Sequence, residues 1–186
     1  AHVDERAAAA KRRGRPKPVY IVKPDSGSSG DGIVLTGEPH CATWSASDSR
    51  VVQEYIAAPM LLDGLKFDLR LYVLLTSVGG GADGGPIRAF LYREGMARFA
   101  VSEYVPPSRT NLRDVHMHLT NYSLNKKSAA YKHTDAADGS DGSKRTASSV
   151  LEALSAAGQL HGVEATWQQL DELVGRALAV MQPALA

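Results

Sequence analysis

Three polar clusters in the sequence carry residue types that suit binding of a phosphorylated ligand. In the first, Lys23 ends a short apolar run and precedes a turn rich in Asp, Ser and Gly at 25–32. A lysine ammonium and the backbone amides of such a turn together attract phosphate oxygens. The turn lacks the Gly-Lys-Ser/Thr ending of a P-loop and no helix pattern follows it, so a hairpin with an exposed lysine is the competing interpretation.

The second cluster lies in "DGLKFDLRLYVLL", residues 63–75, where strand alternation separates an apolar face from a charged face. The apolar face holds Phe67, Leu69, Leu71 and Val73, and the polar face holds Lys66, Asp68, Arg70 and Tyr72. Arg88 and Arg98 flank the next hairpin, so we expect cations to converge on one side of the sheet, where a triphosphate would neutralise them. An antiparallel strand with one solvated face is the alternative.

The third cluster is "MHLTNYS", residues 117–123, which places His118, Thr120, Asn121 and Tyr122 together. These groups suit either contacts to phosphate oxygens or capping of a turn, and the residues alone favour capping. His116 and His118 have the spacing of two metal ligands on one strand face. No cysteine or acidic cluster accompanies them, so we expect no zinc site.

Short β-forming runs separated by turn formers predict a sheet that positions these clusters. The runs are 19–22, 32–36, 50–56, 67–78 and 87–102, with a flexible hairpin connection at 79–86 and a polar low-complexity loop at 132–145. Two helical segments follow, and the second is indicated by apolar residues three or four positions apart. These are Trp167, Leu170, Val174, Leu178 and Met181. The pattern predicts an α+β fold.

Composition restricts the classes of function. With 44% hydrophobic residues in 186, the chain can bury a sizeable core, and its formal net charge of +1 gives no general case for nucleic-acid or membrane binding. A nucleic-acid binder using the basic string at 11–17 would need a more basic domain. The single cysteine, Cys41, is expected to be structural rather than reactive. Residues 1–18 are predicted to be a basic flexible lead-in.

Taken together and in this order, these strings resemble the core of the tubulin-tyrosine-ligase-like enzymes, in the polyglutamylase branch. The resemblance covers residues 19 to about 132, and "KFDLR" with "HLTNYS" are its most specific strings; "VKPDSGSSGDGI", "VVQEYI" and "LYREGMARFA" accompany them. It implies an ATP-grasp-like fold, with antiparallel sheet and helices, incomplete at both ends of this chain.

The resemblance also implies site residues, which match the family position by position. The expected ATP-binding residues are Lys23, Ser26, Gly30, Gly32, Thr120 and Asn121 at the phosphates, Gln53, Glu54, Tyr55 and Ile56 at the adenine, and Lys66 and Asp68 at other nucleotide-contacting positions. Arg70 matches an arginine near the terminal phosphate, and Arg98 matches a position that faces the incoming amino acid.

The implied reaction is ligation of free glutamate to a glutamate side chain in a tubulin C-terminal tail, through an acyl phosphate made with ATP and Mg²⁺. The implied setting is the cytoplasm and cytoskeleton, including the axoneme or basal body of cilia and flagella. Basic residues are candidates for contact with the acidic tail, although they suit a solvated linker and loop equally. They are Lys11–Lys17, Lys126, Lys127, Lys132, Lys144 and Arg145.

The sequence departs from the family pattern at its end, because the expected metal-binding carboxylates and asparagine have no counterpart before Ala186. We therefore expect residues 19–186 to be a partial catalytic domain whose Mg²⁺ ligands lie outside this chain, and we expect the chain alone to be inactive. The alternatives are a glycine or tyrosine ligase, which would share the reacting groups, and a catalytically degenerate microtubule-binding scaffold.

Overall fold

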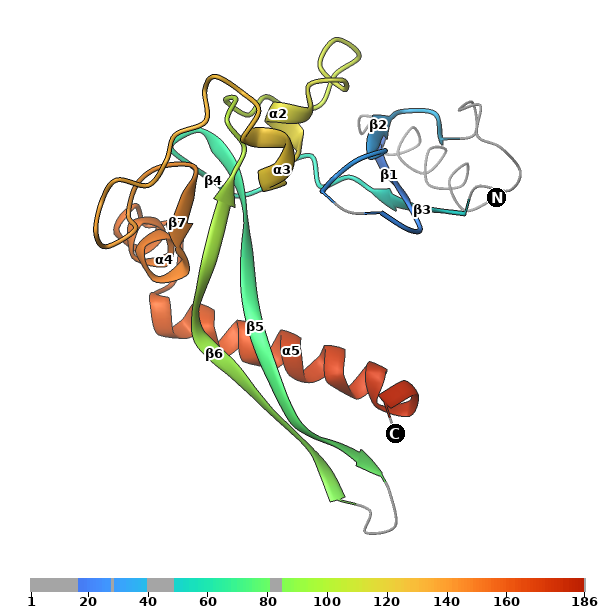
Figure 1. Cartoon of the computed structure of the whole chain (residues 1–186), viewed down its shortest axis with the longest axis vertical. Helices are drawn as coiled ribbons and strands as arrows, with labels where there is room; N and C mark the ends of the chain where they lie inside the picture. Colours follow the sequence, from blue (N-terminus) through green and yellow to red (C-terminus); the bar gives the residue numbers. More distant parts are fainter. Residues whose placement is uncertain (1–16, 28, 40–48, 81–84, 186) are drawn as a thin grey trace. The chain divides into compact units, whose positions relative to one another are not determined.

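The computed structural model describes residues 17–27, 29–39, 49–80 and 85–185, and these residues form two compact units (Figure 1). Within the described residues, the first unit comprises the chain up to Lys66 and Ala100–Tyr131, and the second comprises Phe67–Phe99 and the chain from Lys132 onward. Each unit combines antiparallel strands with helices, as expected for an α+β fold.

The first unit is built on a three-stranded antiparallel sheet in the order β2-β1-β3. The strands are β1 (Tyr20–Pro24), β2 (Val34–Thr36) and β3 (Arg50–Glu54). Ile21 is opposite both Leu35 and Gln53, so these three side chains share one face of the sheet. That face contributes to a core cluster whose buried members are Leu35, Tyr55, Tyr104 and Leu119.

Two single-turn helices complete the first unit: α2 (Val115–His118) and α3 (Tyr122–Asn125). The carboxylate of Asp114 begins α2 by accepting hydrogen bonds from the backbone amides of His116 and Met117 at 3.0 and 3.2 Å. His116 and His118 are therefore helical neighbours, which corrects the strand face inferred for them from their spacing. The two-residue strand β4 (Leu61–Leu62) pairs with the start of β5 through Leu61 opposite Lys66.

The second unit is organised around a long hairpin of β5 (Leu65–Gly80) and β6 (Gly85–Phe99), with β7 (Lys144–Thr146) paired to the end of β6. The register places Asp68 opposite Arg98 and Arg70 opposite Met96, so their side chains lie on one face. The register then shifts between Leu71 and Val73 and again between Leu75 and Ser77.

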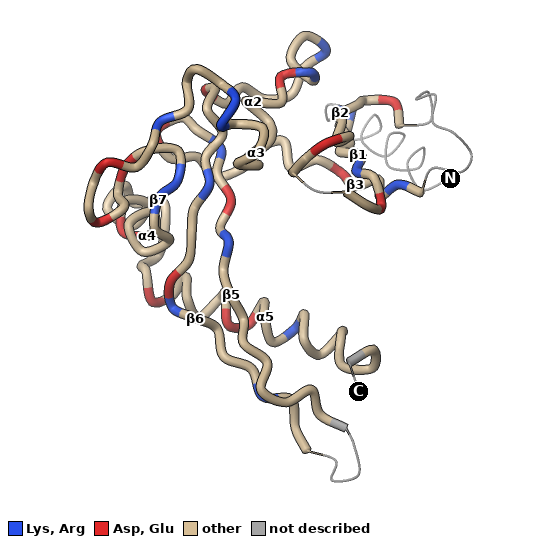
Figure 2. Tube along the Cα trace, in the orientation of Figure 1, with Lys and Arg blue, Asp and Glu red and all other residues tan. Residues whose placement is uncertain are grey.

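The pairing of β5 with β6 corrects two sequence-based expectations. A bulge interrupts the alternation after Leu71, and Val73 is 38% exposed rather than buried with the apolar face. Arg88 pairs near the tip of the hairpin, opposite Ser77, whereas Arg98 pairs near its base. Ten strand residues span about 30 Å, so the two arginines do not converge. Charges along β5 are confined to its first part (Figure 2).

Two helices pack on this hairpin in the second unit. Helix α4 (Ala147–Ala156) packs against β6 and β7, and α5 (Val163–Leu185) packs against β6 and α4 and crosses behind the two strands of the hairpin in Figure 1. Thr146 caps α4 by accepting from the Ser149 amide. Trp167 is buried, as its helical pattern predicted, but Met181 near the other end is 49% exposed, so the predicted apolar face is not buried along its full length.

Most predicted elements are confirmed, with ends displaced by a few residues. Strand β7 begins within the segment predicted to be a polar loop and ends one residue after it; its three residues carry no apolar alternation that would have indicated a strand. Three sequence-based predictions fall outside the described residues: the lead-in up to residue 16, Cys41, and the middle of the hairpin connection at 81–84. Within the described part of the chain, no helix combines the length and hydropathy needed to span a membrane.

Candidate functional site

Lys23 and Gln53 lie together on the sheet of the first unit. The Lys23 Nζ donates a hydrogen bond to Gln53 Oε1 at 2.7 Å, and both side chains are accessible to solvent. Because Lys23 is opposite Val51 and Ile21 is opposite Gln53, the two residues are diagonal neighbours on one sheet face. That face also carries Leu35 of the core cluster. Two residues predicted to bind different parts of a nucleotide are therefore in direct contact.

The turn after β1 approaches the "HLTNYS" segment within the same unit. Gly30 has φ +89°, and a Cβ atom there would meet the Leu124 side chain at 2.8 Å and the Asn121 side chain at 3.0 Å. Only glycine fits this conformation and this space. Gly32 also has a positive φ, of +73°, but lies beside Pro24, and Ser26 is exposed. The backbone of the turn at Gly30 is thus packed closely against the side-chain amide of Asn121.

The segment after β3 joins this arrangement through its backbone. The Tyr55 amide donates to the Val19 carbonyl at 2.8 Å, which extends the pairing of β3 with β1. Glu54 and Ile56 are exposed, Ile56 at 72%, whereas the Tyr55 side chain is buried in the core cluster. At this position the side chains of Glu54 and Ile56, and not that of Tyr55, are accessible to a flat ligand such as adenine.

Lys66 is held by two groups from other parts of the first unit. Its Nζ donates to the Tyr55 hydroxyl and to the His118 carbonyl oxygen, both at 2.9 Å, and lies 4.4 Å from the centre of the Tyr55 ring. The Tyr55 hydroxyl in turn lies 3.1 Å from His118 Nδ1. Burial raises the pKa of the Tyr55 hydroxyl, with a further contribution from Tyr104, so the hydroxyl stays protonated.

His118 is completely buried, and both of its ring nitrogens are engaged: Nδ1 with Tyr55 and Nε2 with the Asn111 carbonyl at 3.1 Å. Neither nitrogen is available to a metal ion. Burial lowers the pKa of the imidazole below its ordinary value of 6.5; Lys66 lowers it further, and the Asn111 and Asp114 contributions only partly oppose this. The folded protein therefore holds His118 neutral.

This lowered pKa predicts a pH dependence of folding. The unfolded chain binds a proton at His118 more readily than the folded protein does. At His118, therefore, protonation should not reduce the free energy of unfolding above pH 6.5, and should reduce it as the pH drops below that value. The loss is at most about 1.4 kcal/mol per pH unit for one proton. Urea unfolding of the wild type and His118→Gln at pH 7.5 and 5.5 tests this: the variant should lose less free energy of unfolding on acidification, and equal losses would contradict the assignment.

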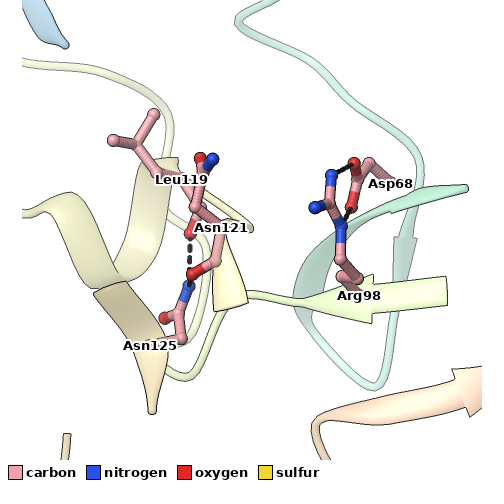
Figure 3. A network of polar contacts seen from close by, with 5 residues as sticks. All are labelled: Asp68, Arg98, Leu119, Asn121 and Asn125. Carbon is pink, nitrogen blue, oxygen red and sulfur yellow. Dashed lines mark hydrogen bonds and ion pairs between the residues drawn. The ribbon is translucent and has the colours of Figure 1, made fainter. Parts of the chain in front are cut away.

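Thr120 and Asn121 follow directly after this histidine. Asn121 takes the N-cap position of α3, yet its side chain makes no capping hydrogen bond, so the capping role favoured from sequence is wrong for this side chain. The local backbone is instead fixed by the buried Asn125, whose Nδ2 donates to the carbonyls of Leu119 at 2.8 Å and Asn121 at 3.1 Å (Figure 3). Thr120 lies between these two anchored carbonyls.

The second unit holds the remaining predicted residues. Arg98 donates from Nε to Asp68 Oδ1 at 3.1 Å and from its terminal nitrogen to Asp68 Oδ2, a two-point ion pair seen in Figure 3. The hydrogen bond to Asp68 raises the pKa of the Arg98 guanidinium. Arg70 lies on the same face but is exposed, with its guanidinium carbon 5.9 Å from the Tyr72 ring centre. Of the two predicted catalytic arginines, Arg98 is paired with a carboxylate, and Arg70 forms no ion pair with a carboxylate of the described residues.

The donor set of the first unit fits a nucleotide. Two ammonium groups, Lys23 and Lys66, and a glycine that admits no side chain against Asn121 are the groups that phosphate oxygens contact in proteins. No group of three or more His, Cys, Asp or Glu among the described residues is arranged to hold a metal ion, so these residues do not fit Mg²⁺ by themselves. A separate cleft of about 580 Å³, lined partly by Thr36, Glu38 and Arg109, contains none of the predicted nucleotide residues.

Sequence reasoning missed the side-chain roles of Tyr55, His118 and Asn125. Tyr55 was assigned to a nucleotide-contacting segment and His118 to a cap or a phosphate contact, but both side chains are buried beneath Lys66. The available signal in the sequence was the apolar neighbours of the two polar residues. His118 and Asn125 are next to Leu119 and Leu124, which pack in the core.

Comparison with known proteins places this arrangement in context. The sequence profile of the tubulin-tyrosine ligase family matches residues 2–185. Over 172 residues the chain is 43% identical to mouse tubulin polyglutamylase TTLL11 and 38% identical to mouse tubulin polyglutamylase TTLL7. Over 177 residues it is 41% identical to a probable beta-tubulin polyglutamylase of Tetrahymena thermophila. The matches cover 91%, 92% and 95% of this chain but only 22%, 18% and 14% of the respective relatives.

Proposed function

Because the chain belongs to the tubulin-tyrosine ligase family, we propose that it is part of an ATP-dependent ligase that adds glutamate to glutamate side chains in tubulin C-terminal tails. The observation that supports this proposal is the presence, inside one unit, of the Lys23–Gln53 hydrogen bond, the Lys66 ammonium held by Tyr55 and His118, and the Gly30–Asn121 contact. Relatives named as tubulin polyglutamylases support glutamate as the amino acid.

In this proposal the first unit binds ATP. Lys23 and Lys66 neutralise phosphate charge, the amides of the turn that contains Gly30 and Gly32 approach the phosphates, and the backbone after Gln53 binds the adenine. The architecture is ATP-grasp-like, which the antiparallel sheets of both units support. Asn125 contributes indirectly by fixing the carbonyls on either side of Thr120.

The residues of the second unit serve the transfer step. The exposed guanidinium of Arg70 stabilises charge on the phosphoryl group as it passes to the tail carboxylate, forming an acyl phosphate. The amine of free glutamate then displaces phosphate and forms the isopeptide bond. Arg98 binds a carboxylate of the incoming glutamate, in exchange for the carboxylate of Asp68 with which it is paired here. Mg²⁺ would be held by ligands outside this chain.

The proposed partner is the acidic C-terminal tail of tubulin on microtubules, and the proposed setting is the cytoskeleton, including ciliary axonemes and basal bodies. Within the described residues, Lys126 and Lys127 are exposed directly after α3 and are suitable for contact with an acidic peptide. The basic string at 11–16 lies outside the described residues.

Labelled amino-acid incorporation by the complete protein tests the proposed function. Taxol-stabilised microtubules are incubated with ATP and Mg²⁺ and with labelled glutamate, glycine or tyrosine in parallel, and microtubules whose tails have been removed by subtilisin are the control. We expect ATP-dependent incorporation of glutamate only, and none into the trimmed microtubules. Preferred incorporation of glycine or tyrosine would reassign the specificity, and microtubule binding without any incorporation would establish the scaffold alternative.

A further inference from the structure

A directed chain of hydrogen bonds ends on the Lys66 ammonium. The direction is fixed at its far end, because the Asn111 carbonyl only accepts and His118 Nε2 must therefore carry the proton. His118 is neutral, so its Nδ1 has a lone pair and accepts from the Tyr55 hydroxyl. The Tyr55 oxygen then presents its own lone pairs to Lys66 Nζ. Each group in the chain has one orientation that satisfies all of its neighbours.

These hydrogen bonds hold the charged Lys66 ammonium in one position, which packing of a core does not require. A long lysine side chain loses much of its conformational entropy when it is immobilised. Here three contacts immobilise Lys66 before any ligand arrives: the Tyr55 hydroxyl, the His118 carbonyl and the face of the Tyr55 ring. Covering the Tyr55–His118 pair with an apolar side chain would cost less free energy than covering it with Lys66, because the lysine ammonium must lose water molecules to approach the pair.

Resting on the proposed function, we propose that Tyr55 and His118 are positioning residues that set the affinity of the ligase for ATP by holding the Lys66 ammonium in its binding geometry. Neither side chain contacts the nucleotide, because both are buried, with exposures of 6% and 0%. Their contribution reaches ATP only through Lys66.

The test measures steady-state kinetics of glutamate incorporation by the complete protein with Tyr55→Phe, Lys66→Gln and the double variant. Tyr55→Phe keeps the ring and its packing and removes only the hydroxyl. Because a hydrogen bond to a charged group is lost, KM for ATP should rise about tenfold while kcat changes less than about twofold. In the Lys66→Gln background, Tyr55→Phe should raise KM for ATP no further, since the group through which it acts is gone.

Val150→Ala is the control for loss of core packing. Val150 is fully buried in α4 and takes no part in the hydrogen bonds that join Asn111, His118, Tyr55 and Lys66. We expect this variant to lower the melting temperature by as much as Tyr55→Phe does while leaving KM for ATP unchanged. Equal increases in KM for the two variants would show a general effect of core damage and would overturn the proposal.

The remaining outcomes are also decisive. An unchanged KM for Tyr55→Phe, or an undiminished effect of it in the Lys66→Gln background, overturns the positioning role while the proposed function stands. A wild-type protein without ATP-dependent incorporation overturns both. If Tyr55→Phe does not fold, His118→Asn and His118→Gln replace it: asparagine keeps an acceptor near Nδ1 and glutamine keeps a donor near Nε2. KM for ATP should then rise more in His118→Gln, and the reverse order or equal values overturn the proposal.

Discussion

Replacing Arg70 with alanine in the complete ligase is expected to lower kcat for glutamate incorporation by about 10²–10³-fold, the usual cost of removing one group that stabilises transition-state charge. The fold should be nearly unaffected. Arg70 is exposed on β5, and its nearest described ring, Tyr72, is 5.9 Å from the guanidinium carbon, so the free energy of unfolding should change by less than about 0.5 kcal/mol. KM for ATP should change far less than kcat, because the interaction is made mainly in the transition state.

Arg88→Ala is the control for this substitution. Arg88 is an exposed arginine of the same hairpin, near its tip and opposite Ser77, so its removal changes the net charge equally. Its kcat should stay within about twofold of the wild type. Arg70→Lys should recover only part of the activity, because an ammonium keeps the charge without the planar two-point geometry. Equal losses of kcat in the Arg70 and Arg88 variants would exclude a specific role for Arg70.

Gly95→Ala should cause the largest loss of stability among single-methyl additions in the described hairpin. A Cβ at Gly95 would lie 2.5 Å from the Arg70 carbonyl oxygen and 2.8 Å from the Leu71 side chain. A backbone carbonyl in a paired strand cannot move aside as a flexible side chain can. We expect the free energy of unfolding to fall by about 2–3 kcal/mol, at the upper end of the usual cost of overpacking.

Gly85→Ala provides the matched control, because Gly85 lies in the same strand and, among the described residues other than its chain neighbours, no atom lies within 4 Å of a Cβ added there. Its free energy of unfolding should change by less than about 0.5 kcal/mol. Chemical denaturation of both variants at one pH measures the difference. The Gly95 variant should also lose kcat, since the obstructed carbonyl belongs to Arg70 itself. A Gly95→Ala protein as stable as Gly85→Ala would contradict the described register between Leu71 and Gly95.

The sequence predicted the strands that carry Lys23 and Arg70, because β-branched and apolar runs bounded by Gly, Pro and Asp report local preferences. It did not predict the bulge after Leu71. Tyr72, Val73 and Leu74 are all suited to a buried face, so no alternation marks where the register shifts. Strand β7 was not predicted for a related reason. Its residue Lys144 pairs with Arg98, which is 46 residues earlier in the chain, and a local sequence pattern does not indicate such pairing.

In the candidate site, too, local features were predicted from the sequence and contacts between distant residues were not. Family-specific strings identified Lys66, but the groups that hold it, Tyr55 and His118, are 11 and 52 residues away along the chain. Their hydrogen bonds depend on the packing of α2 against the core cluster, which no short-range periodicity encodes. The ion pair between Asp68 and Arg98 was also not predicted, because the strand pattern indicated which residues share a face of β5 or β6 but not the register between the two strands.

The division of the chain into two units has a consequence for synthesis on the ribosome. The chain leaves the first unit after Lys66, returns at Ala100 and leaves again after Tyr131, so neither unit is one continuous segment. Emerging residues pair first with near neighbours, and the β5–β6 hairpin is complete in the nascent chain before α2, which supplies His118, has been made. Until then the Lys66 side chain has only one of its two described partners. The ammonium that is fixed in the finished protein is thus among the last features of the first unit to be ordered during translation.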